Sequence, residues 1–252
     1  MANLDISNAS LLLTSSLILI ALIIDYKEKL GLGKDIFIAA FRTVVQLFII
    51  GYVLSSIFKL DNLFVTLAMV AFIIFNAAYN AGKRAKHIPN GFNISLISIG
   101  FGSLVSLLVL FVSGALTWTP SQIVPITGMI ASNAMTAVGV GYRVMDSKYK
   151  DQRQQIQEKL ALGATVKQAS LPIIRESIKS AMAPSVDRAK TVGLVSLPGM
   201  MSGLMFAGID PATAIKYQIV VMFMLIATTG FSTMIASYMT YKTYFNNQDQ
   251  LL

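Results

Sequence analysis

The chain has 252 residues, of which 55% are hydrophobic and 13% are charged, about half the charged share of an ordinary soluble domain. A soluble core of this length could not hide so much apolar surface, whereas a lipid bilayer accepts it directly, so the composition excludes an ordinary soluble protein. The absence of cysteine excludes disulfides and thiolate metal sites, and the net charge of +8 admits either nucleic-acid binding or a membrane-orientation signal.

About seven apolar segments approach the roughly 20 residues that a helix needs to cross a bilayer. No Lys or Arg precedes the first segment, as it would in a secretory signal peptide, so we expect a retained helix with its N-terminus outside. The sixth segment is short and is interrupted by a proline. The expected helices cover Ser7–Ile24, Asp35–Phe58, Asn62–Tyr79, Phe92–Leu116, Gln122–Tyr142, Thr191–Ala207 and Ala212–Tyr241.

The positions of the basic residues decide between the two explanations of the net charge. Most of the 20 Lys and Arg residues fall in loops that share one side of the membrane with the C-terminus. This bias is typical of cytoplasmic loops, so it indicates orientation, and nucleic-acid binding is not expected. We therefore predict an all-α, polytopic protein of the bacterial cytoplasmic (inner) membrane, with its N-terminus outside and its C-terminus cytoplasmic. Residues 1–252 would form a single transmembrane domain.

One long polar segment, at about residues 145–188, is expected on the cytoplasmic side. Ile156, Leu160 and Ala164 recur at four-residue spacing and therefore share one face of a helix. Gly163 interrupts that helix, and Thr165 followed by a glutamine three residues later is typical of a capping box that opens a second helix. The pattern predicts a helix, a glycine turn and a helix. Such an element either presents a short helix to a soluble partner or lies on the membrane surface.

The residues EKLALGATVKQA, at 158–169, resemble the cytoplasmic coupling motif of ABC transporter permeases. Glu158 and Gly163 match that motif in type and spacing, whereas Lys159 and Leu160 stand where it usually has two alanines. Four further segments are similar to the FetB family of ABC permeases, to which iron export is ascribed and which is related to plant proteins of aluminium tolerance. These segments are FRTVVQLFIIGYVL (41–54), SNAMTAVGVG (132–141), KTVGLVSLPGMMSG (190–203) and AGIDPATAIKYQIVVMFML (207–225).

The resemblance implies a permease subunit, not an enzyme, that pairs as a homodimer with a separate ATP-binding cassette subunit. ATP and magnesium would be bound by that partner, and no cofactor is expected in this chain, which has no G-x-x-x-x-G-K-[ST] phosphate loop. The implied function is export of iron, as an ion or as a chelate. The implied contacts with the ATPase are Glu158, Leu160, Leu162, Gly163, Ala164 and Thr165.

Polar residues inside the predicted spans are candidates for the transport pathway. Arg42 is the charged residue that lies well inside a span, and it either contacts an anion or Gln46, one turn on, or snorkels to the cytoplasmic face. Asn76 and Asn133 either line the pathway or form hydrogen bonds between helices.

The break in the sixth predicted span is the second kind of candidate. Pro198 and Gly199 interrupt the helix, and broken helices recur at transport sites, although a packing kink is the alternative. Met200 and Met201 could offer thioether ligands, but no carboxylate, imidazole or thiolate lies in the predicted spans, so the metal site is unknown. Iron could pass through weak contacts with carbonyl and amide groups, or it could move as a chelate. Alternatively, the substrate is not a bare metal ion.

Other classes of membrane protein remain as alternatives. A seven-helix secondary transporter or receptor of unknown substrate would share the predicted topology. An intramembrane hydrolase is disfavoured, because the chain has neither H-E-x-x-H nor G-x-S-x-G. A docking helix for an ATPase is the feature that distinguishes a permease from these classes.

Overall fold

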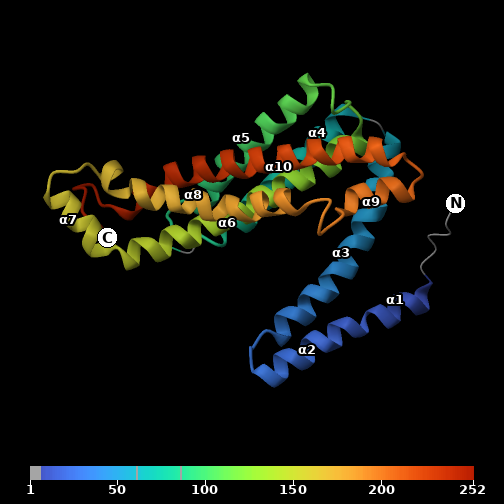
Figure 1. Ribbon diagram of the computed structural model, residues 1–252, viewed down its shortest axis with the longest axis horizontal. Coiled ribbons are helices and arrows are strands. Elements are labelled where there is room, and N and C mark those ends of the chain that lie inside the picture. The colour runs from blue at the N-terminus through green and yellow to red at the C-terminus, as the bar shows by residue number, and fades with distance from the viewer. Residues whose placement is uncertain (1–6, 61, 86) are drawn as a thin grey trace. The chain divides into compact units, whose positions relative to one another are not determined.

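The computed structural model of the protein describes residues 7–60, 62–85 and 87–252 (Figure 1). Within these ranges the chain is helical and contains no strand, apart from two isolated bridges. The predicted all-α class is confirmed. The chain divides into two compact units, one that ends before Asn62 and one that begins there.

The first unit contains α1 (Asn8–Thr14), α2 (Ser16–Glu28) and α3 (Gly33–Leu60). Lys29 ends α2 in the left-handed region, with a φ of 52°, and the Leu32 N–H donates to the Asp25 carboxylate at 2.7 Å. These local bonds fix the turn between α2 and α3. None of the α2 side chains is buried, and α3 exposes apolar side chains around most of its surface, which is a surface that lipid or another membrane protein covers.

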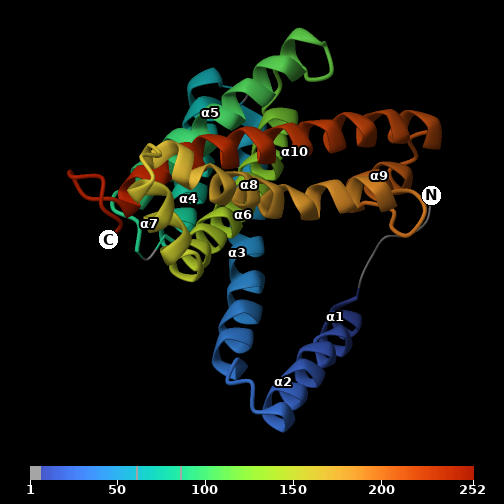
Figure 2. The ribbon, with the colours of Figure 1, turned by 60° about the vertical axis from the view of Figure 1, so that its left-hand side comes forward.

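The second unit consists of longer helices that pack side by side (Figures 1 and 2). Its elements are α4 (Leu63–Gly82), α5 (Gly91–Val112), α6 (Pro120–Asp151), α7 (Arg153–Ala161), α8 (Val166–Thr191), α9 (Gly199–Phe206), α10 (Pro211–Thr240) and the 3₁₀ turn η1 (Tyr241–Tyr244).

Small polar side chains join the helices of this unit. Ser95 and Tyr142 share a hydrogen bond of 2.9 Å between α5 and α6, and Ser106 and Thr228 share one between α5 and α10. All four side chains are buried. Membrane helices associate in this way, because small residues allow close approach and buried hydroxyls find partners on the next helix.

In the described ranges, six helices are long and apolar enough to cross a membrane. They cover Ala9–Glu28, Gly33–Phe58, Leu63–Gly82, Gly91–Val112, Pro120–Asp151 and Pro211–Tyr244. These correspond to six of the predicted spans.

The remaining predicted span, Thr191–Ala207, is not one helix, so the count of seven is not confirmed. Thr191 ends α8, residues 192–198 are irregular, and α9 has only 8 residues. Two residues explain why the helix is interrupted. Gly193 has a φ of 83°, outside the helical region, and Pro198 has no N–H to donate to a preceding turn.

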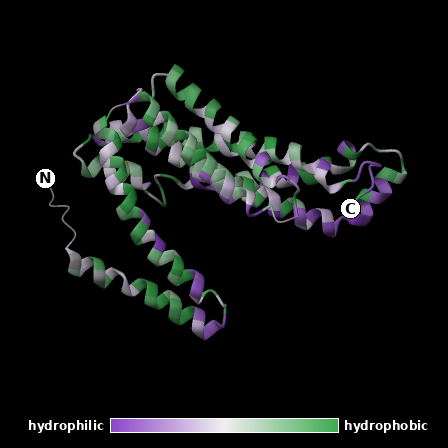
Figure 3. Ribbon diagram, turned by 180° about the vertical axis from the view of Figure 1, so that it is seen from behind, coloured by the Kyte–Doolittle hydropathy of each residue, from purple (hydrophilic) through white to green (hydrophobic). Residues whose placement is uncertain are grey.

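The predicted polar segment is not a separate element. Its first residues continue α6, which at 32 residues is about 48 Å long and exceeds a hydrocarbon core of about 30 Å. Figure 3 shows hydrophilic residues gathered around the end marked C, beyond the mainly hydrophobic middle of the helices. The helix α8 then returns antiparallel to α6 and α10, since the Ser177 hydroxyl donates to the Gly141 carbonyl at 3.0 Å and lies 3.3 Å from that of Ser237.

The far end of α8 reaches the depth of the spanning helices. The Arg188 guanidinium donates to the Asn133 side-chain oxygen at 3.1 Å. Asn133 lies about 14 Å along α6 from Tyr142. Tyr142 in turn is hydrogen-bonded to Ser95, which lies near the end of α5 at Gly91. Arg188 is therefore about 20 Å from that end of α5, a helix about 33 Å long.

The crossing of α4 and α5 gives a test of this packing. A Cβ atom on Gly82 would lie 2.9 Å from the Phe92 Cα, which is backbone and cannot rotate away. We expect Gly82→Ala to lower the stability of the detergent-purified protein by about 1–3 kcal/mol, seen as loss of its gel-filtration peak at a lower temperature. Gly128→Ala is the matched control, since a Cβ there meets nothing within 4 Å, and it should leave stability unchanged or raise it by up to about 1 kcal/mol. Equal stability of the two variants would contradict the helix crossing.

Candidate functional site

Residues 153–169 form the helix, glycine turn and helix that the sequence predicts. α7 ends with the Leu162 N–H donating to the Glu158 carbonyl at 3.0 Å, and the Ala164 N–H donates to the Lys159 carbonyl at 3.0 Å. Gly163 between them has a φ of 89°, a conformation that side-chain-bearing residues rarely adopt. Glycine at this position is therefore required by the backbone of the turn.

Thr165 opens α8 with a complete capping box. Its hydroxyl accepts the Gln168 N–H at 3.3 Å, and the Gln168 side-chain oxygen accepts the Thr165 N–H at 2.9 Å. Two backbone donors that a helix start leaves without partners are satisfied in this way. The predicted capping box is confirmed, and both sides of the turn are held by hydrogen bonds.

The side chains of this turn divide into an exposed tip and a buried base. Leu162 is 88% exposed, and Glu158, Gly163 and Thr165 are also exposed. Ile156 is 1% exposed, whereas Leu160 and Ala164 are half-buried. The Glu158 carboxylate accepts a hydrogen bond from Gln154 at 2.9 Å. An apolar side chain held in the open on a rigid turn is suited to insert into a partner protein.

The base of the turn is a cluster that the sequence analysis did not anticipate. Tyr149 near the end of α6 stacks on Tyr244 with ring centroids 4.0 Å apart, and the Arg153 guanidinium donates to the carbonyls of Leu252 at 2.7 Å and Leu251 at 3.3 Å. The base cluster is made of Met145, Tyr149, Ile156, Ala169, Ile173, Ile174, Tyr241 and Phe245. Residues 241–252 thus hold α7 onto the ends of α6 and α8. The aromatic residues Tyr241, Tyr244 and Phe245 after the last span were the available signal.

Arg42 and Gln46 lie on α3 in the first unit, and both are exposed. The possible contact of Arg42 with Gln46 is not formed, since no hydrogen bond or ion pair of either side chain occurs among the described residues. Their places in a pathway stay predictions.

The two asparagine candidates have different surroundings. Asn76 on α4 is exposed, and its side-chain oxygen accepts from Asn80 at 2.8 Å within the same helix. Asn133 on α6 donates to the Met129 carbonyl at 2.8 Å and accepts from Arg188 of α8. Asn133 therefore joins two helices, as the hydrogen-bonding alternative expects, and it does so with a charged partner.

The predicted helix break lies at the start of α9. Pro198 is the N-cap residue, Gly199 is the first residue of the helix, and Met200 packs against the apolar residues of α5, α6 and α10. Met201 faces a cavity of about 520 Å³ between the end of α8 and α10, which Gln218 also lines. Gln218 is 6% exposed, and its side-chain oxygen has no hydrogen-bond partner in the described part of the chain.

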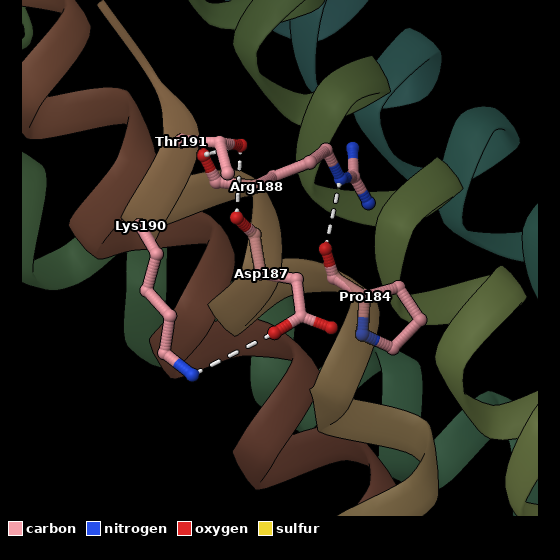
Figure 4. A network of polar contacts seen from close by, with 5 residues as sticks. All are labelled: Pro184, Asp187, Arg188, Lys190 and Thr191. Carbon is pink, nitrogen blue, oxygen red and sulfur yellow. Dashed lines mark hydrogen bonds and ion pairs between the residues drawn. The ribbon is translucent and has the colours of Figure 1, made fainter. Parts of the chain in front are cut away.

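The sequence analysis did not identify the charged residues at the end of α8 as candidates for the transport pathway. Figure 4 shows Asp187 paired with Lys190 at 3.7 Å, and the Arg188 side chain pointing away from both and donating to the Pro184 carbonyl at 3.3 Å. The available signal was Ser177, Ala181 and Ser185, small residues at four-residue spacing that are all buried. They show that the middle of α8 packs closely against its neighbours, so that the charged residues follow directly after a buried stretch.

A site for a bare metal ion does not form within the described residues of one chain. No group of three or more His, Cys, Asp or Glu side chains comes together in that part of the structure. His87 instead lines a cavity of about 390 Å³ with the basic residues Lys83, Arg84 and Arg143.

Comparisons with known proteins extend over nearly the whole chain. Residues 8–245 match the model of the family described as "Uncharacterised protein family (UPF0014)". The "Probable iron export permease protein FetB" of Escherichia coli strain K12 is 54% identical over 248 residues, which cover 98% of this chain and 96% of that protein. The "UPF0014 membrane protein STAR2" of Oryza sativa subsp. japonica is 36% identical, over 94% of this chain and 83% of that protein.

The "Protein ALUMINUM SENSITIVE 3" of Arabidopsis thaliana is 35% identical, over 93% of this chain and 86% of that protein. No solved structure matches. The family model and these relatives agree with the resemblance seen in the sequence and with the membrane-spanning helices of the structure. The chain is therefore a multi-helix membrane permease that belongs to the UPF0014 family.

Proposed function

We propose that the chain is the membrane-spanning subunit of an ABC transporter that exports iron, as an ion or as a chelate. ATP and magnesium are bound and ATP is hydrolysed by a separate partner subunit. The observation that carries this proposal is the α7–α8 turn, which holds an exposed Leu162 on a rigid, buried base.

The turn has the mechanical properties that coupling to an ATPase needs. A docking element must be rigid, because a flexible one would deform when the partner moves and would not transmit the motion to the membrane helices. Here the base cluster joins α7 to α6, α8 and residues 241–252. A displacement of the Leu162 tip is therefore passed to two long helices that run to membrane depth.

The predicted contact residues have distinct parts in this docking. Leu162 is the anchor, because it is a large apolar side chain, 88% exposed in the free chain, that a partner would bury. Glu158 and Thr165 flank the anchor and are exposed to the partner. Leu160, Gly163 and Ala164 shape the turn from beneath.

The orientation follows if α8, residues 192–198 and α9 together make one broken crossing. Figures 1 and 2 show this stretch running away from α7 to the turn before α10, which then returns towards α7. With this crossing the chain spans the membrane seven times. The N-terminus is then outside, and the basic α7 end and the C-terminus are in the cytoplasm, as expected in a bacterial inner membrane.

Iron as the substrate is taken from the relative named an iron export permease, which is 54% identical. A homodimer is supported by the charged end of α8. Asp187 and Lys190 are both 71% exposed in the second unit. A second copy provides a cover for the charged surface that lipid does not.

A secondary transporter driven by an ion gradient is the second candidate, and Asp187 at membrane depth is the observation that favours it. Such a transporter uses an intramembrane carboxylate to bind its coupling ion. It would move iron in vesicles that contain this chain alone, whereas the ABC subunit requires the partner and ATP.

Leu162→Asp tests the docking. Because Leu162 is 88% exposed, the substitution should leave the fold intact while placing a charge in the interface. We expect binding of the ATP-binding subunit to weaken at least about tenfold, or about 1.4 kcal/mol, in co-purification and titration. Gln155→Asp, at an exposed position on α7, is the control and should bind normally. Normal binding by both variants would remove the docking assignment.

Gly163→Pro tests the coupling, because proline cannot adopt the positive φ of this position. We expect the variant to insert in the membrane but to lose the stimulation of ATP hydrolysis that the intact subunit gives its partner. Full stimulation in the variant would show that the turn does not transmit the motion.

The number of crossings can be measured because the chain contains no cysteine. Ser121→Cys and Asn247→Cys introduce single thiols at exposed positions on either side of the broken crossing. A membrane-impermeant maleimide added to intact cells should label Ser121→Cys, and should label Asn247→Cys only after permeabilisation. If both thiols react from the same side, α8 and α9 do not cross the membrane together.

A further inference from the structure

The end of α8 carries three charged side chains at a depth where lipid would otherwise surround the protein. Asp187, Arg188 and Lys190 follow one another within one turn, and the side chains of Asp187 and Lys190 are both 71% exposed. The hydrogen bond from Arg188 to Asn133 fixes this turn about two-thirds of the way along the depth of α5. Exposed charges at such a depth are costly in lipid and are typical of water-filled pathways.

The charges of this turn do not cancel. Asp187 pairs with Lys190, whereas both hydrogen-bond partners of the Arg188 side chain, the Asn133 side chain and the Pro184 carbonyl, are neutral. Among the described residues no carboxylate pairs with Arg188. One chain therefore contributes a net positive charge here, together with a guanidinium that has donors to spare for a ligand.

A cavity adjoins this turn at Ala189, and the three charged side chains lie outside its lining. The cavity of about 520 Å³ is lined by Ala189 and Val192 from the end of α8 and by Gln218 from α10. The Gln218 side chain is more than nine-tenths buried, and its oxygen has no partner in the described part of the chain. A buried amide without a partner beside an open cavity is a group that water or a solute satisfies.

We propose that the charged turn of α8 lines the translocation pathway and selects a solute of net negative charge, so that iron passes as an anionic chelate with carboxylate or phosphate oxygens around the metal. The proposal rests on the proposed transport function and names the form of its substrate. Arg188 is the recognition residue, because the planar guanidinium binds carboxylate and phosphate oxygens in pairs. A bare divalent cation would meet a positive field and, among the described residues, no group of three or more His, Cys, Asp or Glu side chains.

A second copy of the chain encloses this pathway on the side that one chain leaves open. Its α8 doubles the positive charge around the solute. Asp187 acts as a positioning residue through Lys190, whose ammonium it orients at 3.7 Å. If these side chains faced lipid instead of a pathway, the same charges would lie where no water or counterion reaches them.

The absence of cysteine permits a test that requires neither ATPase nor iron. Ala189→Cys introduces one thiol beside the cavity and keeps all three charges. The full-length variant is reacted in membranes with two methanethiosulfonates of matched size, one carrying a sulfonate and one a trimethylammonium group. Leu108→Cys, on the apolar exposed surface of the α5 span, is the control.

We expect the thiol at position 189 to react with both reagents, the anionic one about tenfold faster at low salt, and the thiol at position 108 to react with neither. Adding Arg188→Gln to Ala189→Cys should remove most of the anion preference while labelling persists. No labelling at position 189 would show that water does not reach this turn. Faster reaction with the cationic reagent would overturn the anionic substrate.

These outcomes are separate from failure of the proposed function. If co-purification finds no ATP-binding partner while position 189 still prefers the anionic reagent, the pathway inference stands and the energy source is wrong. If the partner binds and position 189 does not react, the transporter assignment stands and α8 does not line its pathway. The salt dependence is an internal check, since an electrostatic preference should fall as ionic strength rises.

Discussion

The close packing of α8 between α6 and α10 is the constraint on which the rest of the structure depends. Ser177 bonds to the backbone of Gly141 and lies against Ser237, and Ala181 and Ser185 continue the same buried face. Small residues let the three helices approach closely enough for these contacts. Because that face of α8 is buried, Asp187 and Lys190 lie on its exposed side, whereas the Arg188 side chain reaches Asn133 of α6.

The same packing connects the two regions of interest in the molecule. The α7–α8 turn lies at one end of α8, and the turn formed by Asp187, Arg188 and Lys190 lies near the other. A helix of 26 residues is about 39 Å long, so α8 joins the two turns through one continuous element. Motion at the turn would thus change the surroundings of Arg188 and Asn133 directly, without a chain of intervening loops.

Hydropathy predicted the spanning helices well, because lipid imposes a length and a composition that a sequence displays openly. The capping box at Thr165 and the glycine turn were also predictable, since their geometry depends on near neighbours in the chain. The packing of α8 against the spanning helices was not, because its many polar residues average to the hydropathy of a soluble helix. This packing depends on contacts with Gly141 and Asn133, which are distant in sequence. The irregular stretch before α9 was recognised from Pro198, but its extent depends on the backbone at Gly193.

The bonds from Arg153 to the carbonyls of Leu251 and Leu252 have a consequence for the order in which the protein is made. Nearly a hundred residues, including α8, α9 and α10, are synthesised between the two sides of this contact. A ribosome therefore delivers Arg153 long before its acceptors exist, and the base of the α7–α8 turn stays incomplete while α9 and α10 are made. A soluble partner that recognised the finished turn would therefore bind only after α10 had been synthesised.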